Sequence, residues 1–252
     1  MLMTRGILYI SPGNFVKEAK ISAKRLDEEM PDVSISIITD EQVSAECFDN
    51  IIKKNIAHGW EAKPNNISLS PYDTTIYIDT DTYIVDDISE IFNLLERYDM
   101  AAALQPTGKT SIIRDVPQCM PEYNTGVIGF KSNGKVMETF ELWKNVYNSR
   151  PEKEDQPSFR KALFKSGSNI VTLPSEYNCR WTSAGLLSTS VKLFHGRIVE
   201  FEEEIQGQRS SIDVKDAVKK INKNHHHRVF MNYDGKIKIK AKNESPDDVK
   251  FM

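Results

Sequence analysis

The sequence predicts an α/β fold, with a mixed and mostly parallel sheet flanked by helices. Strand-like and helix-like segments alternate from the start of the chain, in the order strand, helix, strand, helix, strand. In addition, an apolar run at 74–78 passes directly into acidic residues, in the stretch TTIYIDTDTYIVDDISEIF. Ligands of open α/β sheets bind beyond the carboxyl ends of strands, so this stretch predicts a binding site.

Local patterns predict the first three strands and their connections. RGILYI at 5–10 is an apolar run that ends in a Ser-Pro-Gly turn. Apolar residues recur at a helical spacing between about 15 and 30, and the β-branched residues of DVSISIITD at 32–40 favour a second strand. We expect a helix and a loop around GWEAKPNN at 59–66, followed by the strand at 74–78.

Strands and helices continue to alternate in the second half of the chain. We expect strands in YDMAAALQP and in YNTGVIGFKSN, where Gly126 and Gly129 allow another group to approach the backbone closely. We expect helices in GKVMETFELWKNVYN and in DQPSFRKALFKSG, the second closed by Gly167. NIVTLPSEYNCRW and VKLFHGR complete the predicted core.

The composition changes at about residue 200, which predicts a core at 1–200 and a charged C-terminal extension at 201–252. Within the extension, KIKIKAK alternates lysine with apolar residues, as in an edge strand protected by charge. His225, His226 and His227 are adjacent, and adjacent side chains of a regular element cannot all face one ion. We interpret these histidines as part of a solvated tail.

Composition and charge exclude several classes of protein. The 252 residues carry a net charge of −3, which does not favour nucleic acid as a partner. The three cysteines lie far apart and form no CxxC pair, as is usual in a reducing compartment, and we expect a cytoplasmic protein. No apolar run is long enough for a signal peptide or a transmembrane segment. A homo-oligomer is left open.

The acidic residues after 74–78 are the first candidates for a site. Residues two apart in a strand share a face, so Asp79 and Asp81 lie together if the strand continues that far. Two close carboxylates repel each other, and a divalent cation with oxygen ligands would relieve the repulsion. Both could instead be turn residues, where aspartate is common. Asp87 and Glu90 fit a helix start with a capping box.

Five separated segments occur in one order along the chain: SPYDTTIYIDTDTYIVDDI with Lys63 upstream, YNTGVIGF, EDQPSF, LPSEYN, and His195 with Gly196. This arrangement resembles the GT-A glycosyltransferases, particularly glycosyltransferase family eight and its glycogenin-like relatives. The likeness spans roughly 6–197. It implies a GT-A core, Rossmann-like in its sheet, with a nucleotide-binding half at about 1–105 and an acceptor half at 106–200.

The resemblance implies a metal-dependent glycosyltransferase of the hexosyltransferase type. Asp79, Asp81 and His195 would hold one divalent cation, expected to be Mn²⁺, because a mixed oxygen and nitrogen ligand set leans away from Mg²⁺. The cation would bridge the two phosphates of a nucleotide-diphosphate sugar, expected to be a UDP-sugar, and stabilise the departing diphosphate. The acceptor, a carbohydrate, lipid or protein, is not named by the sequence.

Further residues would contact the donor by the same resemblance. The candidate catalytic residues are Asp155, Gln156 and Asn124, of which the first two would line the donor sugar and the reacting face. The candidate cofactor-binding residues are Ser11, Asp40, Lys63, Asp79, Thr80, Asp81 and Gly196. Many family members follow His-Gly with a Lys-Pro-Trp element whose lysine reaches the diphosphate. This chain reads HGRIVEFEEE, so Arg197 or Lys192 would have to substitute.

Three other functions compete with glycosyl transfer. An apolar strand ending in Asp-x-Asp also resembles the motif of haloacid-dehalogenase-type phosphatases, where Asp79 would be the nucleophile. That motif normally ends the first strand, and its fifth position is Thr or Val, whereas here it is Tyr83. A nucleotidyltransferase would need a Gly-rich phosphate loop after the first strand, where YISPGNF has one glycine. A non-catalytic sugar-nucleotide-binding protein is the third alternative.

Overall fold

A seven-stranded sheet forms the centre of the computed structural model, which describes residues 3–106, 111–149, 154–180, 185–196, 228–233, 236–241 and 250–251. In sheet order, its strands are β3 (Asn50–Lys53), β2 (Ser34–Thr39), β1 (Arg5–Ile10), β4 (Thr74–Ile78), β7 (Tyr123–Lys131), β6 (Met100–Leu104) and β8 (Ile170–Leu173). All neighbouring strands run parallel except β7, which is antiparallel to β4 and β6. The predicted mixed, mostly parallel sheet is confirmed.

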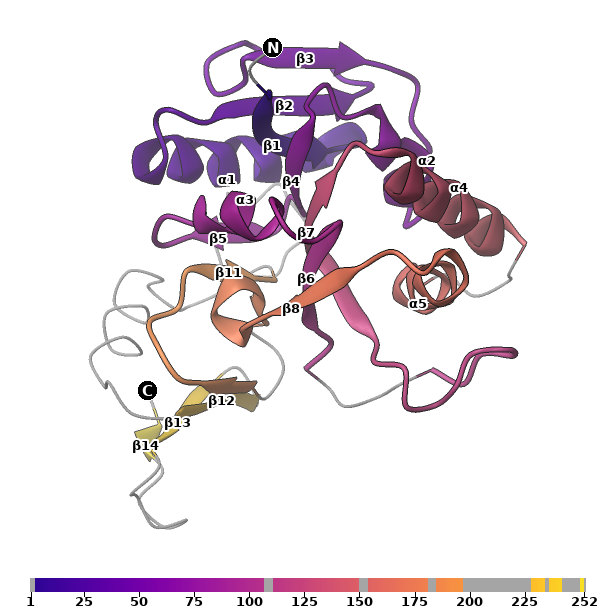
Figure 1. Ribbon diagram of the computed structural model, residues 1–252. Helices are drawn as coiled ribbons and strands as arrows, with labels where there is room; N and C mark the ends of the chain where they lie inside the picture. Colours follow the sequence, from indigo (N-terminus) through magenta and orange to yellow (C-terminus); the bar gives the residue numbers. More distant parts are fainter. Residues whose placement is uncertain are drawn as a thin grey trace.

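Helices cover both faces of this sheet (Figure 1). Helices α1 (Val16–Glu29) and α3 (Glu90–Leu94) pack on one face, and α2 (Ala62–Asn66), α4 (Gly134–Asn148) and α5 (Gln156–Ser166) pack on the other. The short 3-10 helices are η1 (Gly13–Phe15), η2 (Ile67–Leu69) and η3 (Ser175–Asn178). Gly167 closes α5 with a φ of 62°, in the left-handed conformation predicted for it.

Each face of the sheet has its own hydrophobic core, because strand side chains alternate between the two faces. In β1, Ile7 and Tyr9 belong to the core that includes α1, whereas Leu8 and Ile10 belong to the core that includes α4 and α5. All four side chains are buried. Burial on both faces explains why this strand is a continuous apolar run.

Two smaller sheets accompany the central one. A three-stranded sheet contains β5 (Thr82–Ile84), β11 (Leu193–His195) and β9 (Cys179–Arg180), with β11 in the middle. A four-stranded sheet contains β10 (Gly185–Leu187), β12 (Arg228–Tyr233), β13 (Lys236–Ala241) and β14 (Lys250–Phe251), in that order. The strand predicted in KIKIKAK is therefore present, but the prediction of an edge position is wrong, because β13 pairs with β12 and with β14.

The structure departs from the sequence predictions at two further points. Strand β3 was not anticipated, since NIIK is short and mostly exposed. The predicted capping box is also wrong: α3 begins at Glu90, and Asp87 accepts hydrogen bonds from the backbone N–H and the hydroxyl of Ser89 at 2.6 and 3.0 Å. The histidines at 225–227 lie outside the described residues. No helix within the described ranges is long and apolar enough to cross a bilayer.

Trp143 of α4 anchors the core on its face of the sheet. Its side chain is fully buried against the rings of Phe140 and Phe159. We expect Trp143→Ala to lower the free energy of unfolding by about 3–5 kcal/mol, because a large cavity replaces the indole. Urea denaturation should show this loss, whereas Trp60→Ala, at a 57% exposed side chain, should change the free energy by less than about 0.5 kcal/mol. Equal losses in the two variants would contradict this description of the core.

Candidate functional site

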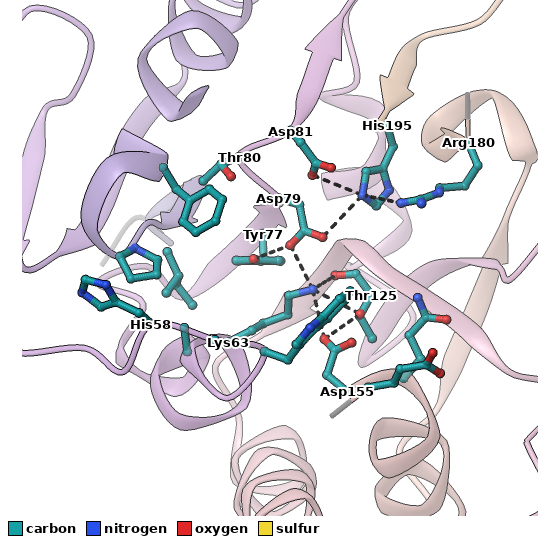
Figure 2. A pocket seen from close by; sticks show the side chains of 18 of the residues that line it. His58, Lys63, Tyr77, Asp79, Thr80, Asp81, Thr125, Asp155, Arg180 and His195 are labelled. Carbon is teal, nitrogen blue, oxygen red and sulfur yellow. Dashed lines mark hydrogen bonds and ion pairs between the residues drawn. The ribbon is translucent and has the colours of Figure 1, made fainter. Parts of the chain in front are cut away.

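The candidate site lies where several strands of the central sheet end. Strands β1, β2 and β4 run parallel, so the residues that follow them reach one edge of the sheet. Strand β7 begins at the same edge, where the backbone N–H of Asp79 donates to the carbonyl of Gly126 at 2.8 Å. A pocket of about 630 Å³ opens there (Figure 2). The residues that line it include Pro12, Phe15, His58, Trp60, Lys63, Tyr77, Asp79, Thr80, Asp81, Thr125, Asp155, Gln156, Arg180 and His195.

A turn, and not the alternation of a strand, brings the two aspartates together. Strand β4 ends at Ile78, so the condition for a shared strand face is not met, and the alternative of turn residues describes this stretch. The hydroxyl of Thr82 donates to the carbonyl of Asp79 at 2.9 Å, and the N–H of Gly196 donates to the carbonyl of Asp81 at 2.8 Å. These bonds fix the backbone of the turn and leave both carboxylates facing the pocket.

A buried chain of hydroxyl groups supports this turn from the α1 side. The single hydroxyl proton of Thr82 goes to the carbonyl of Asp79, so Thr82 accepts from Ser22 at 2.8 Å, and Ser22 accepts from Tyr9 at 2.9 Å. Burial raises the pKa of Tyr9 well above its ordinary value, which keeps its phenol protonated as the first donor. The chain ties α1, β1 and β5 to the position of Asp79.

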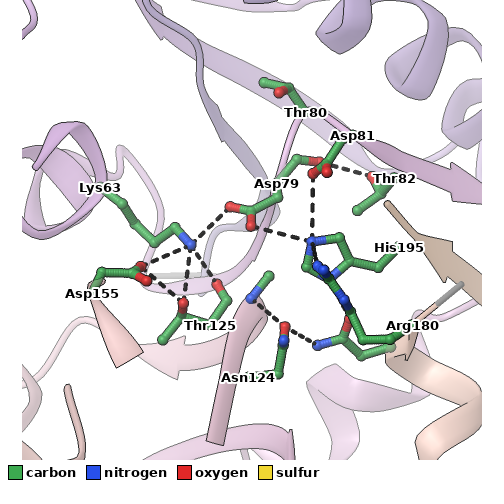
Figure 3. Close-up of polar contacts among 12 residues, drawn as sticks. Lys63, Asp79, Thr80, Asp81, Thr82, Asn124, Thr125, Asp155, Arg180 and His195 are labelled. Carbon is green, nitrogen blue, oxygen red and sulfur yellow. Dashed lines mark hydrogen bonds and ion pairs between the residues drawn. The ribbon is translucent and has the colours of Figure 1, made fainter. Parts of the chain in front are cut away.

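Strand pairing in the three-stranded sheet brings His195 to the two aspartates. Thr82 of β5 lies opposite His195 of β11, which in turn lies opposite Arg180 of β9. The Nε2 atom of His195 is 3.5 Å from Oδ2 of Asp79 and 3.4 Å from Oδ1 of Asp81 (Figure 3). The ligand atoms of the three residues lie within 4.8 Å of one another. The structure thus assembles the predicted metal-ligand set.

Gly126 makes room for the imidazole of His195. A Cβ atom at position 126 would lie 2.0 Å from Cε1 of His195, far inside van der Waals contact. The predicted close approach to the backbone at Gly126 is therefore confirmed, and the approaching group is a metal-ligand candidate. At Gly129, a Cβ atom would lie 2.8 Å from Ile91, so that glycine serves packing against α3.

Hydrogen bonds at both nitrogens orient the His195 ring. Nδ1 lies 2.8 Å from Oδ1 of Asn178, and Nη1 of Arg180 lies 2.9 Å from Nε2. A guanidinium only donates, so in this geometry Nε2 accepts and the ring proton sits on Nδ1. Burial lowers the pKa of His195, but the carboxylates of Asp81 and Asp79 outweigh it and raise the pKa overall. With the ring proton on Nδ1, Nε2 is the nitrogen that could bind a metal ion placed between the ring and the two carboxylates.

Lys63 is the positive centre of a buried charge network. Its Nζ lies 2.9 Å from Oδ1 of Asp79 and 3.1 Å from Oδ2 of Asp155, and it donates to the carbonyl and hydroxyl of Thr125 at 3.0 and 3.1 Å. Burial lowers the pKa of Lys63, but Asp155 and Asp79 raise it by more. Burial likewise raises the pKa of Asp79, but Lys63 above all, with His195, holds it well below its ordinary value. Both groups are therefore charged at neutral pH.

Asp155 has one satisfied and one unsatisfied carboxylate oxygen. Its side chain is 1% exposed, and Oδ2 accepts from the hydroxyl of Thr125 at 2.9 Å. Oδ1 is buried and has no hydrogen-bond partner among the residues that the structure describes. The backbone carbonyl of Asp155 accepts from the indole N–H of Trp143 at 3.0 Å, which ties this residue to the core. An unsatisfied buried oxygen in a pocket is a site for a ligand donor group.

Asp40 acts on the pocket through a histidine. It accepts from the backbone N–H of Gly13 at 2.8 Å, and its other oxygen lies 2.6 Å from Nε2 of His58. Desolvation raises the pKa of Asp40, but these hydrogen bonds outweigh it and lower the pKa. His58 lines the pocket beside Pro12 and Trp60, whereas Asp40 itself is not among the lining residues. Figure 2 shows His58 at the end of the pocket away from His195.

The structure places the other predicted residues in two groups. Thr80 and Gln156 line the pocket. Ser11, Asn124 and Gly196 are buried behind it. Asn124 accepts from the amide of Asn178 at 2.8 Å and so supports the residue that orients His195. Lys192, one proposed substitute for the family lysine, pairs with Asp86 at 2.6 Å outside the pocket, and Arg197 lies outside the described residues.

Sequence reasoning assigned no role to three residues of the site. Tyr77 donates its hydroxyl to Oδ1 of Asp79 at 2.5 Å, and its place two residues before Asp79 is a local signal of this contact. His58 and Arg180 carry no such local signal, because each reaches the site through a loop or a short strand distant in sequence from its partner.

Comparisons with known proteins agree on one kind of enzyme. A family model described as nucleotide-diphospho-sugar transferase matches residues 74–245. The glycosyltransferase GlyE of Streptococcus pneumoniae TIGR4 has a similar structure, with a TM-score of 0.60 and 14% identity over 87% of this chain and 60% of GlyE. This chain therefore spans about 60% of the GlyE length. A search of curated protein sequences finds no significant match.

A second solved structure is nearer in length. The galactosyltransferase LgtC, solved in complex with donor and acceptor sugar analogues, is similar with a TM-score of 0.60 and 11% identity. The match covers 85% of this chain and 94% of LgtC. At such identities the structural likeness shows the fold, which is the GT-A fold of these glycosyltransferases.

Replacing Gly126 tests the room made for His195. We expect Gly126→Ala to displace the imidazole of His195 and to weaken Mn²⁺ binding at least tenfold. A displaced ligand needs to reduce the free energy of binding by only about 1.4 kcal/mol to produce that factor. Titration of Mn²⁺ followed by electron paramagnetic resonance measures the free ion. Gly134→Ala is the matched control, since a Cβ atom there meets nothing within 4 Å. Unchanged affinity in a folded Gly126→Ala protein would contradict the proposed role of His195.

Lys63→Met tests the buried charge network. At neutral pH we expect the free energy of unfolding to fall by about 3–5 kcal/mol, because Asp79 and Asp155 are left without their cation. The folded-state pKa of Asp79 is lowered, so its contribution to stability is present above the unfolded value of about 3.9 and is lost as pH falls through the folded pKa. The deficit of the variant should therefore shrink below about pH 5.

Urea denaturation at a series of pH values measures this deficit. Lys144→Met is the control, because Lys144 forms an exposed ion pair with Glu141 at 3.6 Å and should change stability little at any pH. A Lys63→Met deficit that is equally large at acidic and at neutral pH would show that the lost contribution is packing and not charge.

Proposed function

The chain belongs to the nucleotide-diphospho-sugar transferase family, and on this premise we propose that it transfers a sugar from a UDP-sugar to an acceptor with the help of Mn²⁺. The observation that carries the proposal is the convergence of Asp79, Asp81 and His195 on one point at the edge of the sheet. Two carboxylates and one neutral imidazole nitrogen form a ligand set for a divalent cation.

The donor set supports Mn²⁺ in preference to Mg²⁺. Mg²⁺ is bound through oxygen, whereas imidazole suits the transition metals. Asn178 holds the Nδ1 side of His195, so Nε2 is the nitrogen that would bind the cation. When bound, the cation would supply Lewis-acid stabilisation of the diphosphate that leaves the sugar.

The pocket offers suitable surroundings for each part of the donor. Pro12, Phe15, His58 and Trp60 give the pocket an apolar and aromatic part of its lining, which suits a nucleobase, and Figure 2 shows His58 at the end away from His195. Arg180 and the metal-ligand set lie at the other end (Figure 2), where the diphosphate would be placed. The volume of the pocket, about 630 Å³, is in the usual range for a site that binds a small molecule.

Asp155 and Gln156 line the pocket and would contact the donor sugar. The free Oδ1 of Asp155 can accept a hydrogen bond from a sugar hydroxyl, which would satisfy the buried oxygen. Lys63 and Thr125 hold the other oxygen of Asp155, so the accepting atom is fixed before the donor binds. Such preorganisation favours a transition state in which positive charge develops on the sugar ring. Asn124 would contribute by positioning Asn178 and thereby His195.

The site does not favour the phosphatase alternative. A phosphatase nucleophile needs an available carboxylate oxygen. Oδ1 of Asp79 already accepts from Tyr77 and pairs with Lys63, and Oδ2 lies 3.5 Å from Nε2 of His195. Both oxygens of Asp79 thus serve the charge network and the metal-ligand set.

Thermal denaturation with nucleoside diphosphates tests the proposed function. UDP and Mn²⁺ together should raise the melting temperature by about 5 °C or more when UDP is at 100 times its dissociation constant, since this is worth about 2.7 kcal/mol. Either component by itself should give a smaller shift. GDP, CMP and ADP in parallel identify the base, and release of the diphosphate from UDP-sugars measures turnover.

Two variants make this experiment specific. Asp81→Asn should abolish the joint effect of UDP and Mn²⁺, whereas Asp87→Asn, an exposed acid in the same stretch, should retain it. Release of inorganic phosphate from simple phosphomonoesters, without any response to UDP and Mn²⁺, would instead favour the phosphatase.

A further inference from the structure

We propose that Arg180 is a placeholder that exchanges between two partners: it holds Nε2 of His195 when no metal is bound, and it binds the donor diphosphate once a divalent cation occupies the metal-ligand set. This inference rests on the proposed function and adds to it a donor-binding residue and a coupling between the metal and the nucleotide. It also names a cation that can replace the lysine absent from HGRIVEFEEE.

The exchange follows from competition for one lone pair. Nη1 of Arg180 lies 2.9 Å from Nε2 of His195, and the same nitrogen faces Oδ2 of Asp79 and Oδ1 of Asp81. A neutral imidazole has a single accepting nitrogen, which can take the hydrogen bond of Arg180 or bind a metal, but not both. Binding of a cation at Nε2 therefore releases Arg180 from its partner.

Arg180 has few other contacts to hold it. Within the described ranges, no carboxylate lies within ion-pair distance of its guanidinium, and its side chain is half-buried at the pocket wall. Arg160 shows the contrast, since it is buried and donates to four backbone carbonyls of the 111–120 segment. Arg160 is built into the fold, whereas Arg180 can turn toward a new partner.

The charge of the pocket indicates what that partner is. Among the described lining residues, the permanent cations are Lys63 and Arg180, and Lys63 already neutralises Asp79 and Asp155. A diphosphate beside the metal-ligand set would lie next to the guanidinium of Arg180, which Figure 3 shows at the His195 side of that set. A planar guanidinium binds phosphate oxygens through two parallel hydrogen bonds, which suits a leaving diphosphate.

This arrangement couples the two ligands in a measurable way. Without nucleotide, Mn²⁺ must displace Arg180 from His195, so Arg180 opposes metal binding. With nucleotide, the displaced guanidinium gains the diphosphate, so Arg180 favours the joint complex. Because coupling between two binding sites is reciprocal, UDP must increase the affinity for Mn²⁺ by the same factor by which Mn²⁺ increases the affinity for UDP. Arg180 accounts for part of that factor.

Arg180→Ala should therefore change the two affinities in opposite directions. We expect Mn²⁺ binding without nucleotide, measured by electron paramagnetic resonance, to become about three- to tenfold tighter, as for loss of one competing hydrogen bond. We expect UDP binding at saturating Mn²⁺, measured by calorimetry, to become about 10- to 100-fold weaker, as for loss of a charged hydrogen-bonded pair. Arg180→Lys should lie between the wild type and Arg180→Ala in UDP affinity.

Arg114→Ala is the matched control, because the side chain of Arg114 is 94% exposed and is not among the residues that line the pocket. Weaker or unchanged Mn²⁺ binding by Arg180→Ala would overturn the placeholder, and unchanged UDP binding would overturn the contact with the diphosphate. If Arg180→Ala does not fold, Arg180→Gln in the same two titrations decides the matter. A wild type that binds Mn²⁺ but no nucleoside diphosphate would instead overturn the proposed function. The Mn²⁺ titration of Arg180→Ala without nucleotide would still test whether Arg180 competes with the metal for His195.

Discussion

The concentration of negative charge at one edge of the sheet is the constraint on which the rest of this structure depends. Asp79, Asp81 and Asp155 lie around one pocket, and close carboxylates in a partly buried place repel unless cations or hydrogen-bond donors surround them. Lys63 separates Asp79 from Asp155. His195 faces Asp79 and Asp81, with Arg180 behind it. The fold is organised so that Lys63 and Arg180 bring their positive charges to this edge from distant segments of the chain.

The central sheet supplies the rigid base of this arrangement. Two hydrophobic cores, one on each face, fix the ends of β1, β4 and β7 relative to one another. Both cores also reach the charged groups directly. Trp143 of one core donates to the backbone of Asp155, and Tyr9 of the other begins the hydroxyl chain that ends at Asp79. Packing far from the pocket therefore sets the positions of its carboxylates.

The two ends of the charge network differ in character. The Lys63 end is closed, because the ammonium has four oxygen atoms around it and its partners Asp155 and Thr125 are buried. At the His195 end, one partner can replace another. Nε2 of His195 lies 2.9 Å from Arg180 and also faces the carboxylates of Asp79 and Asp81, so Arg180 and a metal ion would compete for it. A fixed end and an exchangeable end within one pocket suit an enzyme that binds and releases a charged leaving group at each turnover.

The fold class and the local chemistry follow from the amino-acid pattern. Its apolar runs and helical spacing predict β1, α1, β2 and β4 because periodicity reports which faces are buried. The predicted metal ligands could be named in advance because Asp79 and Asp81 lie two residues apart after an apolar run and the ordered segments resemble a family. Strand β3 was missed, since four mostly exposed residues carry little pattern.

Only the tertiary structure decided which partners meet. The register of β5, β11 and β9 places Thr82, His195 and Arg180 side by side, and no local pattern encodes pairing between segments so far apart. The same holds for Lys63, whose short helix gives no sign that its side chain enters the pocket between two acids. Strand and helix propensities are properties of neighbours in sequence, whereas charge compensation depends on distances that exist only after the sheets have assembled.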